Sequence, residues 1–231
     1  GVQTCALPIL RLGASSGEWK AMVADEAART TFAKNIKTVL EKNKLDGIDL
    51  DFEWAENEKE YKDYSLAILK MREVLGDKYL FSVSLHPVCY KISKEAIEAV
   101  DFISLQCYGP SPVRFPIEKY CSDIQMVLEY GIPKEKLVAG VPFYGVTKDN
   151  SKKTEAYFNF VQNGLVTSPA QNEVIYQGDT YVFDGQDNIR IKTRYAKEQK
   201  LKGMMSWDLA TDLPLSDSRS LLKTMTEELR E

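Results

Sequence analysis

The chain alternates between two hydrophobic patterns. From about residue 25 onward, short runs rich in β-branched and aromatic residues alternate with stretches in which apolar residues recur at helical spacing. The pattern predicts helices over residues 25–43, 59–75, 93–99, 117–130, 187–200 and 216–230. It predicts strands near residue 10 and over 47–54, 79–85, 102–108, 137–144 and 203–208, and a small hairpin at 173–183 within a long irregular connection, 146–185. This alternation is typical of a parallel sheet covered by helices.

Two of the predicted helices carry end signals. Asp25 is placed to cap the first turn of the helix at 25–43, and Gly76 is placed to close the helix at 59–75. No glycine-serine linker divides the chain, so we expect a single domain over residues 10–231. Residues 1–9 are interpreted as a non-native or disordered leader.

Composition narrows the class of protein. The 231 residues are 44% hydrophobic and 28% charged, as in an ordinary globular protein. Lys and Arg number 30 against 34 Asp and Glu, a balance that lacks the basic surplus needed to bind nucleic acid. No apolar run approaches the roughly 20 residues that cross a bilayer. The four cysteines show no metal-binding spacing and are interpreted as free thiols.

The segment 46–53 carries the chemistry. Side chains alternate along a strand, so Asp49, Asp51 and Glu53 share one face at intervals of about 6.5 to 7 Å, and the apolar residues between them share the other. Carboxylates this close are expected to share protons. A solvated strand edge and a Mg²⁺ or Ca²⁺ site are the alternatives, but no glycine-rich phosphate loop or further ligand accompanies a metal. A proton-donating site is therefore favoured.

The spacing Asp46-x-x-Asp49-x-Asp51-x-Glu53 resembles the signature of the family 18 glycoside hydrolases, the chitinases and endo-β-N-acetylglucosaminidases. The resemblance continues through residues 81–85, 105–108, 140–145 and 203–207 and covers nearly all of the chain from about residue 10. It implies an α/β fold, a (β/α)8 TIM-type barrel. The six predicted strands would correspond to strands three to eight of that barrel, with strands one and two missing. Such a fragment is expected to be poorly soluble or inactive by itself.

The resemblance also implies a role for each matching residue. Glu53 would be the general acid and base, Asp51 would orient the substrate's acetamido N–H, and Asp49 would tune a proton shared with Asp51. Tyr108 would bind the acetamido oxygen. The implied substrate-binding residues are Trp207, Gln106, Tyr144 and Asp46.

Several aromatic residues and the only histidine have open roles. One of Phe143 and Tyr144 is expected to face the sugar site while the other packs under a helix. His86 could contact sugar hydroxyls, although a structural histidine with a satisfied ring is favoured. Trp19, expected in a loop, could stack on sugar or pack. Family members commonly carry Asp or Asn after the tyrosine of the sixth strand, whereas this chain has Gly109.

The resemblance implies hydrolysis of β-1,4 bonds in chitin or chitooligosaccharides by a substrate-assisted, retaining mechanism. An endo-β-N-acetylglucosaminidase acting on the chitobiose core of N-glycans is the alternative, and a non-catalytic chitinase-like lectin is the second. No cofactor or metal is implied, and the family suggests a secreted, periplasmic or cell-surface protein. The connection before residues 203–208 looks too short for the family's α+β insertion, which favours an endo-acting groove.

Overall fold

The computed structural model describes residues 9–14, 17–109, 115–149 and 153–230, and the chain divides into two compact units. Unit 1 comprises Gly1–Ser104 with Tyr130–Ile132, and unit 2 comprises Leu105–Glu129 with Pro133–Glu231. The leader predicted for residues 1–9 lies outside the described residues except for Ile9, which begins the first strand. A single catalytic domain over residues 10–231 stays a prediction.

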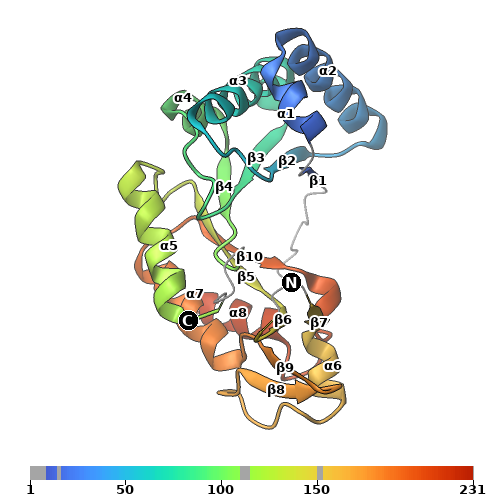
Figure 1. Ribbon diagram of the computed structural model, residues 1–231, viewed down its shortest axis with the longest axis vertical. Coiled ribbons are helices and arrows are strands. Elements are labelled where there is room, and N and C mark those ends of the chain that lie inside the picture. The colour runs from blue at the N-terminus through green and yellow to red at the C-terminus, as the bar shows by residue number, and fades with distance from the viewer. Residues whose placement is uncertain (1–8, 15–16, 110–114, 150–152, 231) are drawn as a thin grey trace. The chain divides into compact units, whose positions relative to one another are not determined.

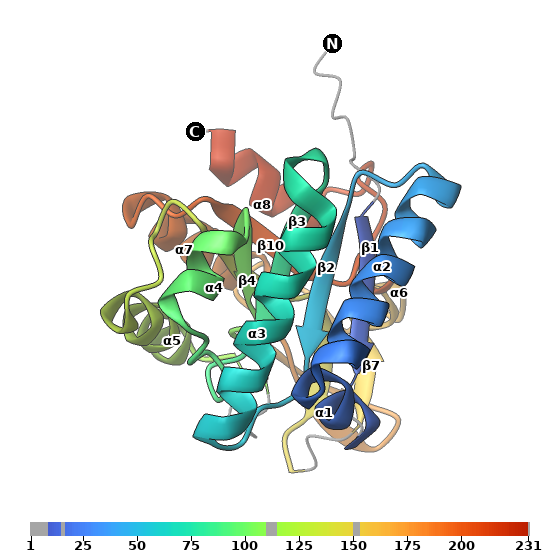
Figure 2. The same cartoon turned by 90° about the horizontal axis from the view of Figure 1, so that it is seen from above.

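Unit 1 is a parallel sheet with helices packed along it (Figures 1 and 2). Its strands lie in the order β1 (Ile9–Ala14), β2 (Gly47–Phe52), β3 (Leu80–Leu85) and β4 (Phe102–Leu105). The connecting helices are α1 (Gly17–Ala24), α2 (Glu26–Asn43), α3 (Glu58–Leu75) and α4 (Lys94–Ala99), with a 3₁₀ turn at Gly76–Lys78. The predicted alternation of strand and helix is confirmed. Closure into a barrel and the match to strands three to eight stay predictions.

The predicted helix ends of unit 1 are confirmed. The carboxylate of Asp25 accepts the backbone N–H of Ala28 at 2.7 Å, which satisfies one of the donors left unpaired in the first turn of α2. Gly76 follows α3 with φ at 60°, a backbone conformation that favours glycine.

The apolar face of β2 forms the core of unit 1. The side chains of Ile48, Leu50 and Phe52 are 2% exposed or less, and the Phe52 ring lies 4.9 Å from that of Tyr64 on α3. The alternation of apolar and acidic residues read from the sequence is therefore the alternation of the two faces of this strand.

Gly47 fixes how closely β2 approaches β3. A Cβ atom at this position would lie 2.2 Å from the carbonyl oxygen of Leu80, and the N–H of Leu80 donates to the carbonyl oxygen of Asp46 at 2.9 Å. Only glycine fits without moving the backbone of one strand, so the register of β2 against β3 depends on this residue.

Gly47→Ala is expected to lower the free energy of unfolding by about 1–3 kcal/mol, because the added methyl group overpacks the start of the sheet. Urea unfolding measures the change. Gly17→Ala is the matched control, since a Cβ there meets no atom within 4 Å. Equal stability of the two variants would contradict the close approach.

Unit 2 contains a parallel strand pair and a small antiparallel sheet. Strand β5 (Leu137–Pro142) pairs in parallel with β10 (Gly203–Trp207). The antiparallel sheet has the order β7 (Thr154–Ala156), β6 (Tyr144–Thr147), β9 (Asp179–Val182) and β8 (Glu173–Tyr176). The helices are α5 (Ile117–Tyr130), which ends in unit 1, α6 (Tyr157–Gln162), α7 (Gln186–Glu198) and α8 (Leu221–Arg230), with a 3₁₀ turn at Leu209–Thr211.

The connection between β5 and α7 corrects the sequence analysis. The hairpin predicted at 173–183 is confirmed, since β8 and β9 pair antiparallel through the turn at Gln177 and Gly178. The rest of the connection is not irregular, because β6, β7 and α6 complete a small α+β subdomain around it. The expectation that no α+β insertion fits here is therefore wrong, and the endo-acting preference loses its support.

Several predicted boundaries also move. Strand β2 ends at Phe52, one residue before Glu53, and β4 ends at Leu105, before Gln106 and Tyr108. The predicted strand 137–144 is two strands separated by Phe143, whose N–H donates to the carbonyl oxygen of Trp207 at 2.8 Å. The last helix begins at Leu221 instead of residue 216.

Unit 2 buries one ion pair completely. The Lys192 ammonium lies 2.5 Å from a carboxylate oxygen of Asp184 and donates to the carbonyl oxygen of Phe115 at 2.9 Å, and both charged side chains are 2% exposed or less. Burial raises the pKa of Asp184, and the Lys192 charge opposes that shift. Removing either partner would leave the other as an uncompensated buried charge.

Lys192→Met is expected to lower the free energy of unfolding by about 3–5 kcal/mol, because Asp184 and the Phe115 carbonyl would lose their partner. Lys148→Met is the control, because the Lys148–Glu173 pair is exposed (62% and 50%) and such pairs contribute about 1 kcal/mol or less. Denaturant unfolding of both variants tests the ranking. A smaller loss for Lys192→Met than for the control would refute it.

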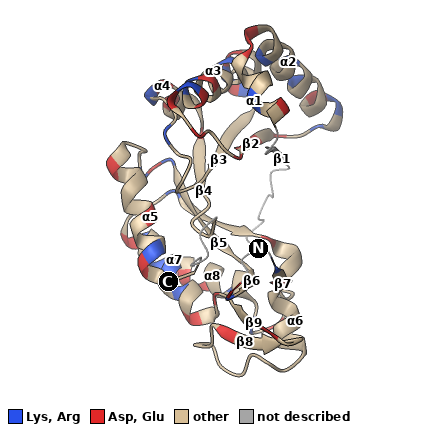
Figure 3. Cartoon of the chain, viewed as in Figure 1, with Lys and Arg blue, Asp and Glu red and all other residues tan. Residues whose placement is uncertain are grey.

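The surface of unit 1 carries both signs of charge. Acidic and basic side chains are interspersed along α3 and α4 (Figure 3). Among the described residues, the helices are all too short or too polar to cross a bilayer.

Candidate active site

The two inner carboxylates of the acidic segment are buried in unit 1. Asp49 is 9% exposed and Asp51 is 2% exposed, and both belong to β2. The hydroxyl of Ser82 donates to Asp49 Oδ1 at 2.6 Å, and the hydroxyl of Ser84 donates to Asp49 Oδ2 at 2.7 Å. Both oxygens of Asp49 are therefore held, and the carboxylate has one fixed orientation.

The two serines are functional-site residues that the sequence analysis did not single out. Parallel pairing sets Asp49 opposite Ser82 and Asp51 opposite Ser84. The signal was present in the alternation Phe81-Ser82-Val83-Ser84-Leu85, which gives β3 a hydroxyl face beside the carboxylate face of β2. Only the register of the pair shows which carboxylate receives the hydroxyl groups.

Glu53 follows the last residue of β2, and its side chain is 32% exposed. Parallel strands present functional residues at their carboxyl ends, which is where Glu53 lies. His86 follows the last residue of the neighbouring strand β3, and its Nε2 atom lies 3.6 Å from Glu53 Oε1. The Trp54 ring meets the His86 ring edge to face, with 5.1 Å between centroids.

Asp46 is not part of this group. It is exposed and precedes β2, so seven residue steps along the strand separate it from Glu53 by roughly 22–24 Å. Trp19 is not in a loop but on α1, where its ring packs 5.1 Å from Phe32 and 6.1 Å from Phe52. The ring of Trp19 therefore packs in unit 1, and the stacking alternative has no support.

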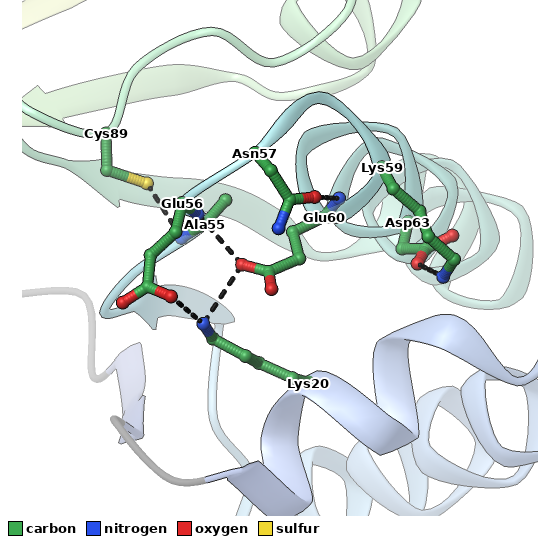
Figure 4. A network of polar contacts seen from close by, with 8 residues as sticks. All are labelled: Lys20, Ala55, Glu56, Asn57, Lys59, Glu60, Asp63 and Cys89. Atoms are coloured by element: carbon green, nitrogen blue, oxygen red, sulfur yellow. Dashed lines mark hydrogen bonds and ion pairs between the residues drawn. The ribbon is translucent and has the colours of Figure 1, made fainter.

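The segment that follows Glu53 is tied to two helices and to the loop after β3 (Figure 4). The N–H of Ala55 donates to Cys89 Sγ at 3.3 Å, and the N–H of Glu56 donates to Glu60 Oε2 at 2.8 Å. Lys20 of α1 binds Glu56 at 2.8 Å and Glu60 at 3.0 Å. These contacts fix the backbone that carries the exposed carboxyl.

Glu60 is the centre of this network. It accepts the N–H of Glu56 and the ammonium of Lys20, and these contacts, in that order, hold its pKa below the ordinary value of 4.5. A carboxyl whose pKa is lowered by folding stabilises the folded protein at pH values above its pKa in the unfolded chain. This contribution is lost as the pH falls through the lower pKa of the folded state.

Glu60→Gln is expected to lower the free energy of unfolding at pH 7. The difference in this free energy between the variant and the wild type is expected to shrink as the pH falls below 4.5, because protonation then removes the charge of Glu60 in the wild type as well. Urea unfolding at pH 7 and pH 3 measures this. Glu73→Gln serves as the control, because Glu73 is 66% exposed and contacts Lys70 alone among the described ion pairs. A difference from wild type that is the same at both pH values would count against the network.

The other predicted residues lie in unit 2. The hydroxyl of Tyr108 donates to Gln106 Oε1 at 3.3 Å, and both residues are under 5% exposed. Tyr144, at the start of β6, meets the Tyr108 ring edge to face at 6.3 Å between centroids. Trp207 ends β10 and is 41% exposed, whereas Phe143 is fully buried. The predicted division between Phe143 and Tyr144 agrees with this burial.

Gly140 gives Tyr108 its place. A Cβ atom at Gly140 would lie 3.0 Å from the Tyr108 ring and 2.7 Å from the carbonyl oxygen of Leu105. The absence of a side chain on β5 therefore lets the tyrosine ring lie against this strand.

The described cysteines and carboxylates form no metal centre. Cys89, Cys107 and Cys121 are free thiols, and Cys5 lies outside the described residues. In the part of the chain that the structure describes, no three His, Cys, Asp or Glu side chains are grouped so as to hold a metal ion.

Parallel strands with helices between them, and carboxylates leading to the carboxyl end of one strand, define the class of α/β proteins that includes the TIM-barrel glycoside hydrolases. The family model for the glycosyl hydrolases family 18 matches residues 9–212, and the chain belongs to that family.

Relatives and solved structures agree with this family. A probable chitinase 2 of Drosophila melanogaster is 23% identical over 261 residues, which is 85% of this chain and 54% of that protein. The GH18 chitinase ChiB from the chitin utilization locus of Flavobacterium johnsoniae is 26% identical, with a TM-score of 0.78 over 95% of this chain and 73% of that one. The chitinase-like agglutinin of Robinia pseudoacacia, 18% identical, has a TM-score of 0.80 over 95% and 80%.

These similarities differ in what they show. The chain spans only 39 to 65% of the length of the first three curated relatives it matches. The likeness to the agglutinin shows the fold alone, and this fold is shared by a chitinase and a chitinase-like agglutinin.

Proposed function

We propose that the protein hydrolyses β-1,4-glycosidic bonds of N-acetylglucosamine-containing polysaccharide, chitin or chitooligosaccharides, with Glu53 as general acid and base. One observation carries the proposal. The carboxyl of Glu53 is partly exposed just past the end of β2, while Asp51 and Asp49 are buried along the same strand. The carboxyl of Glu53 can therefore contact a substrate, whereas the carboxyls of Asp49 and Asp51 lie behind it on the strand.

In the proposed reaction, Glu53 gives its proton to the glycosidic oxygen as the bond from that oxygen to the anomeric carbon breaks. The acetamido oxygen of the substrate forms the new bond to the anomeric carbon, giving a cyclic oxazolinium ion. The Glu53 carboxylate then takes a proton from water as the water oxygen attacks the same carbon and the bond from that carbon to the acetamido oxygen breaks, which restores the acetamido group. Two displacements at one carbon retain its configuration.

Each supporting residue has a proposed task. Asp51 orients the acetamido N–H, and Asp49, held by Ser82 and Ser84, stays fixed beneath it. Tyr108 binds the acetamido oxygen, and Gln106 holds the Tyr108 hydroxyl. Trp207 and Tyr144 contact the sugar. We assign no substrate contact to Asp46, because it lies at the other end of β2 from Glu53.

Two alternatives share this site or this fold. An endo-β-N-acetylglucosaminidase would use the same residues on the chitobiose core of N-glycans, so only substrate profiles separate it from a chitinase. A chitinase-like lectin would bind without cutting, and the acid at position 53 favours the enzyme over the lectin. The proposal includes a secreted, periplasmic or cell-surface location, which the family suggests.

Glu53→Gln in the full-length protein is expected to lower kcat on chitooligosaccharides by about 10²–10⁴-fold, because the amide cannot donate the proton, while sugar binding survives. Product release and calorimetric binding measure the two effects. Glu58→Gln, an exposed change at the start of α3, is the matched control.

The stereochemistry of the product and the choice of substrate also test the proposal. Wild-type product should appear first as the β-anomer by NMR, and deacetylated chitosan should not be cut, because the nucleophile is the acetamido group. Unchanged turnover by Glu53→Gln, or an inverted product, would overturn the mechanism. Cleavage of N-glycans in preference to chitin would select the endo-β-N-acetylglucosaminidase.

A further inference from the structure

The position of His86 is not explained by packing alone. Its side chain is 6% exposed, and Nε2 lies 3.6 Å from Oε1 of Glu53. The other ring nitrogen, Nδ1, is buried and has no hydrogen-bond partner. A histidine retained for stability usually has both nitrogens satisfied, since a buried polar atom without a partner destabilises the fold. The expectation of a satisfied structural histidine is therefore wrong.

The backbone holds His86 in place beside Glu53. The N–H of His86 donates to the carbonyl oxygen of Cys89 at 3.2 Å, and the N–H of Cys89 donates to that of His86 at 2.8 Å. Cys89 Sγ in turn accepts the N–H of Ala55, two residues after the acid. The ring packs edge to face on Trp54, one residue after it. The loop that carries the imidazole is thus joined to the segment that carries the carboxyl.

We propose that His86 is a positioning residue for Glu53, with the Nε2–H of a neutral imidazole directed at the carboxyl. A neutral imidazole has one N–H, and we place that proton on Nε2 because this is the ring nitrogen that faces the carboxyl, whereas Nδ1 faces no acceptor. At 3.6 Å the contact is longer than a hydrogen bond, so the ring does not compete for the proton of the acid. This inference rests on the proposed function of Glu53.

The Nε2–H of His86 is useful at the stage of the proposed reaction in which Glu53 is negatively charged. Glu53 becomes negative when it has given its proton to the leaving group, and it must stay in place to accept a proton from water. The N–H dipole beside the carboxylate, with Nε2 3.6 Å from Oε1, stabilises that charge electrostatically. His86 exchanges no proton in this scheme.

Acidic groups surround the loop that carries His86, since burial first, and then Asp51 of β2 and Glu60 of α3, raise the pKa of the Cys89 thiol. Asp49 and Asp51 lie on β2, and Glu53 follows its last residue. The loop contributes Cys89, and burial raises the pKa of its thiol. Helix α3 contributes Tyr61 and Tyr64, whose pKa values burial also raises. These three groups are neutral near pH 7.

The single histidine of the chain allows a direct spectroscopic test. The imidazole ¹⁵N shifts at pH 7 are expected to show the proton on Nε2 in the wild type, and the Nε2 signal is expected to move in Glu53→Gln but not in Glu58→Gln. This measurement does not depend on turnover. A proton on Nδ1, or an Nε2 signal unmoved by Glu53→Gln, would overturn the inference even if Glu53 proves to be the acid.

Kinetics provide the second test. His86→Phe keeps an aromatic ring against Trp54 but removes the Nε2–H, so kcat is expected to fall about 10–100-fold with KM unchanged. His86→Gln places an amide N–H near the same point and is expected to recover part of kcat. Thermal unfolding should show His86→Phe at least as stable as the wild type, because the unpartnered Nδ1 is gone.

The outcomes separate the possibilities. Wild-type kcat in His86→Phe would overturn the positioning role, and a rise in KM without loss of kcat would show that His86 binds sugar instead. Equal losses in His86→Phe and His86→Gln, together with lower stability of both, would show a structural role only. Full activity of Glu53→Gln would refute the proposed function, whereas the NMR result would still stand or fall by itself.

Discussion

The parallel pairing of β2 with β3 is the constraint on which the acidic site depends. Its register sets the hydroxyl groups of β3 beside the carboxylates of β2, and the same register ends both strands so that Glu53 and His86 follow them as neighbours. A shift of one residue would turn the carboxylates toward the helices and the apolar side chains toward the site. The chemistry of the segment therefore depends first on backbone geometry, and the close approach at Gly47 is where that geometry is most restricted.

The acid itself lies outside regular structure. Strand β2 ends at Phe52, and the segment after the acid is held by the contacts made by Ala55, Glu56 and Glu60. These contacts reach α1, α3 and the loop after β3, which are distant from each other in the sequence. A partly exposed carboxyl on a well-held segment suits a group that must meet substrate and return to one place.

Local patterns predicted a large part of the fold. Helices α2 and α3 follow from apolar spacing together with Asp25 and Gly76, because each signal acts within one turn of the chain. Boundaries set by distant groups were missed. Helix α8 begins where Asp212 accepts the N–H groups of Leu221 and Leu222, and no local signal marks a partner nine residues upstream.

The acidic site divides in the same way. The family resemblance and the strand alternation predicted Asp49, Asp51 and Glu53, because those signals lie within eight residues of sequence. The sequence could not show the tie from Ser82 to Asp49 or the closeness of His86 to Glu53, since both depend on strand pairing. Motif membership also placed Asp46 with the site, although spacing along a strand separates its two ends.

The buried ion pair of unit 2 has a consequence for how folding could be followed. Lys192 is enclosed by Asp184, the Phe115 carbonyl and the ring of Tyr120, so acylating reagents have no access to its amine in the folded protein. Exposed lysines such as Lys148 would react in the folded protein, whereas Lys192 would react only in molecules that have opened. The fraction of molecules that carry the added mass of an acyl group on Lys192 would therefore measure how often this part of unit 2 opens.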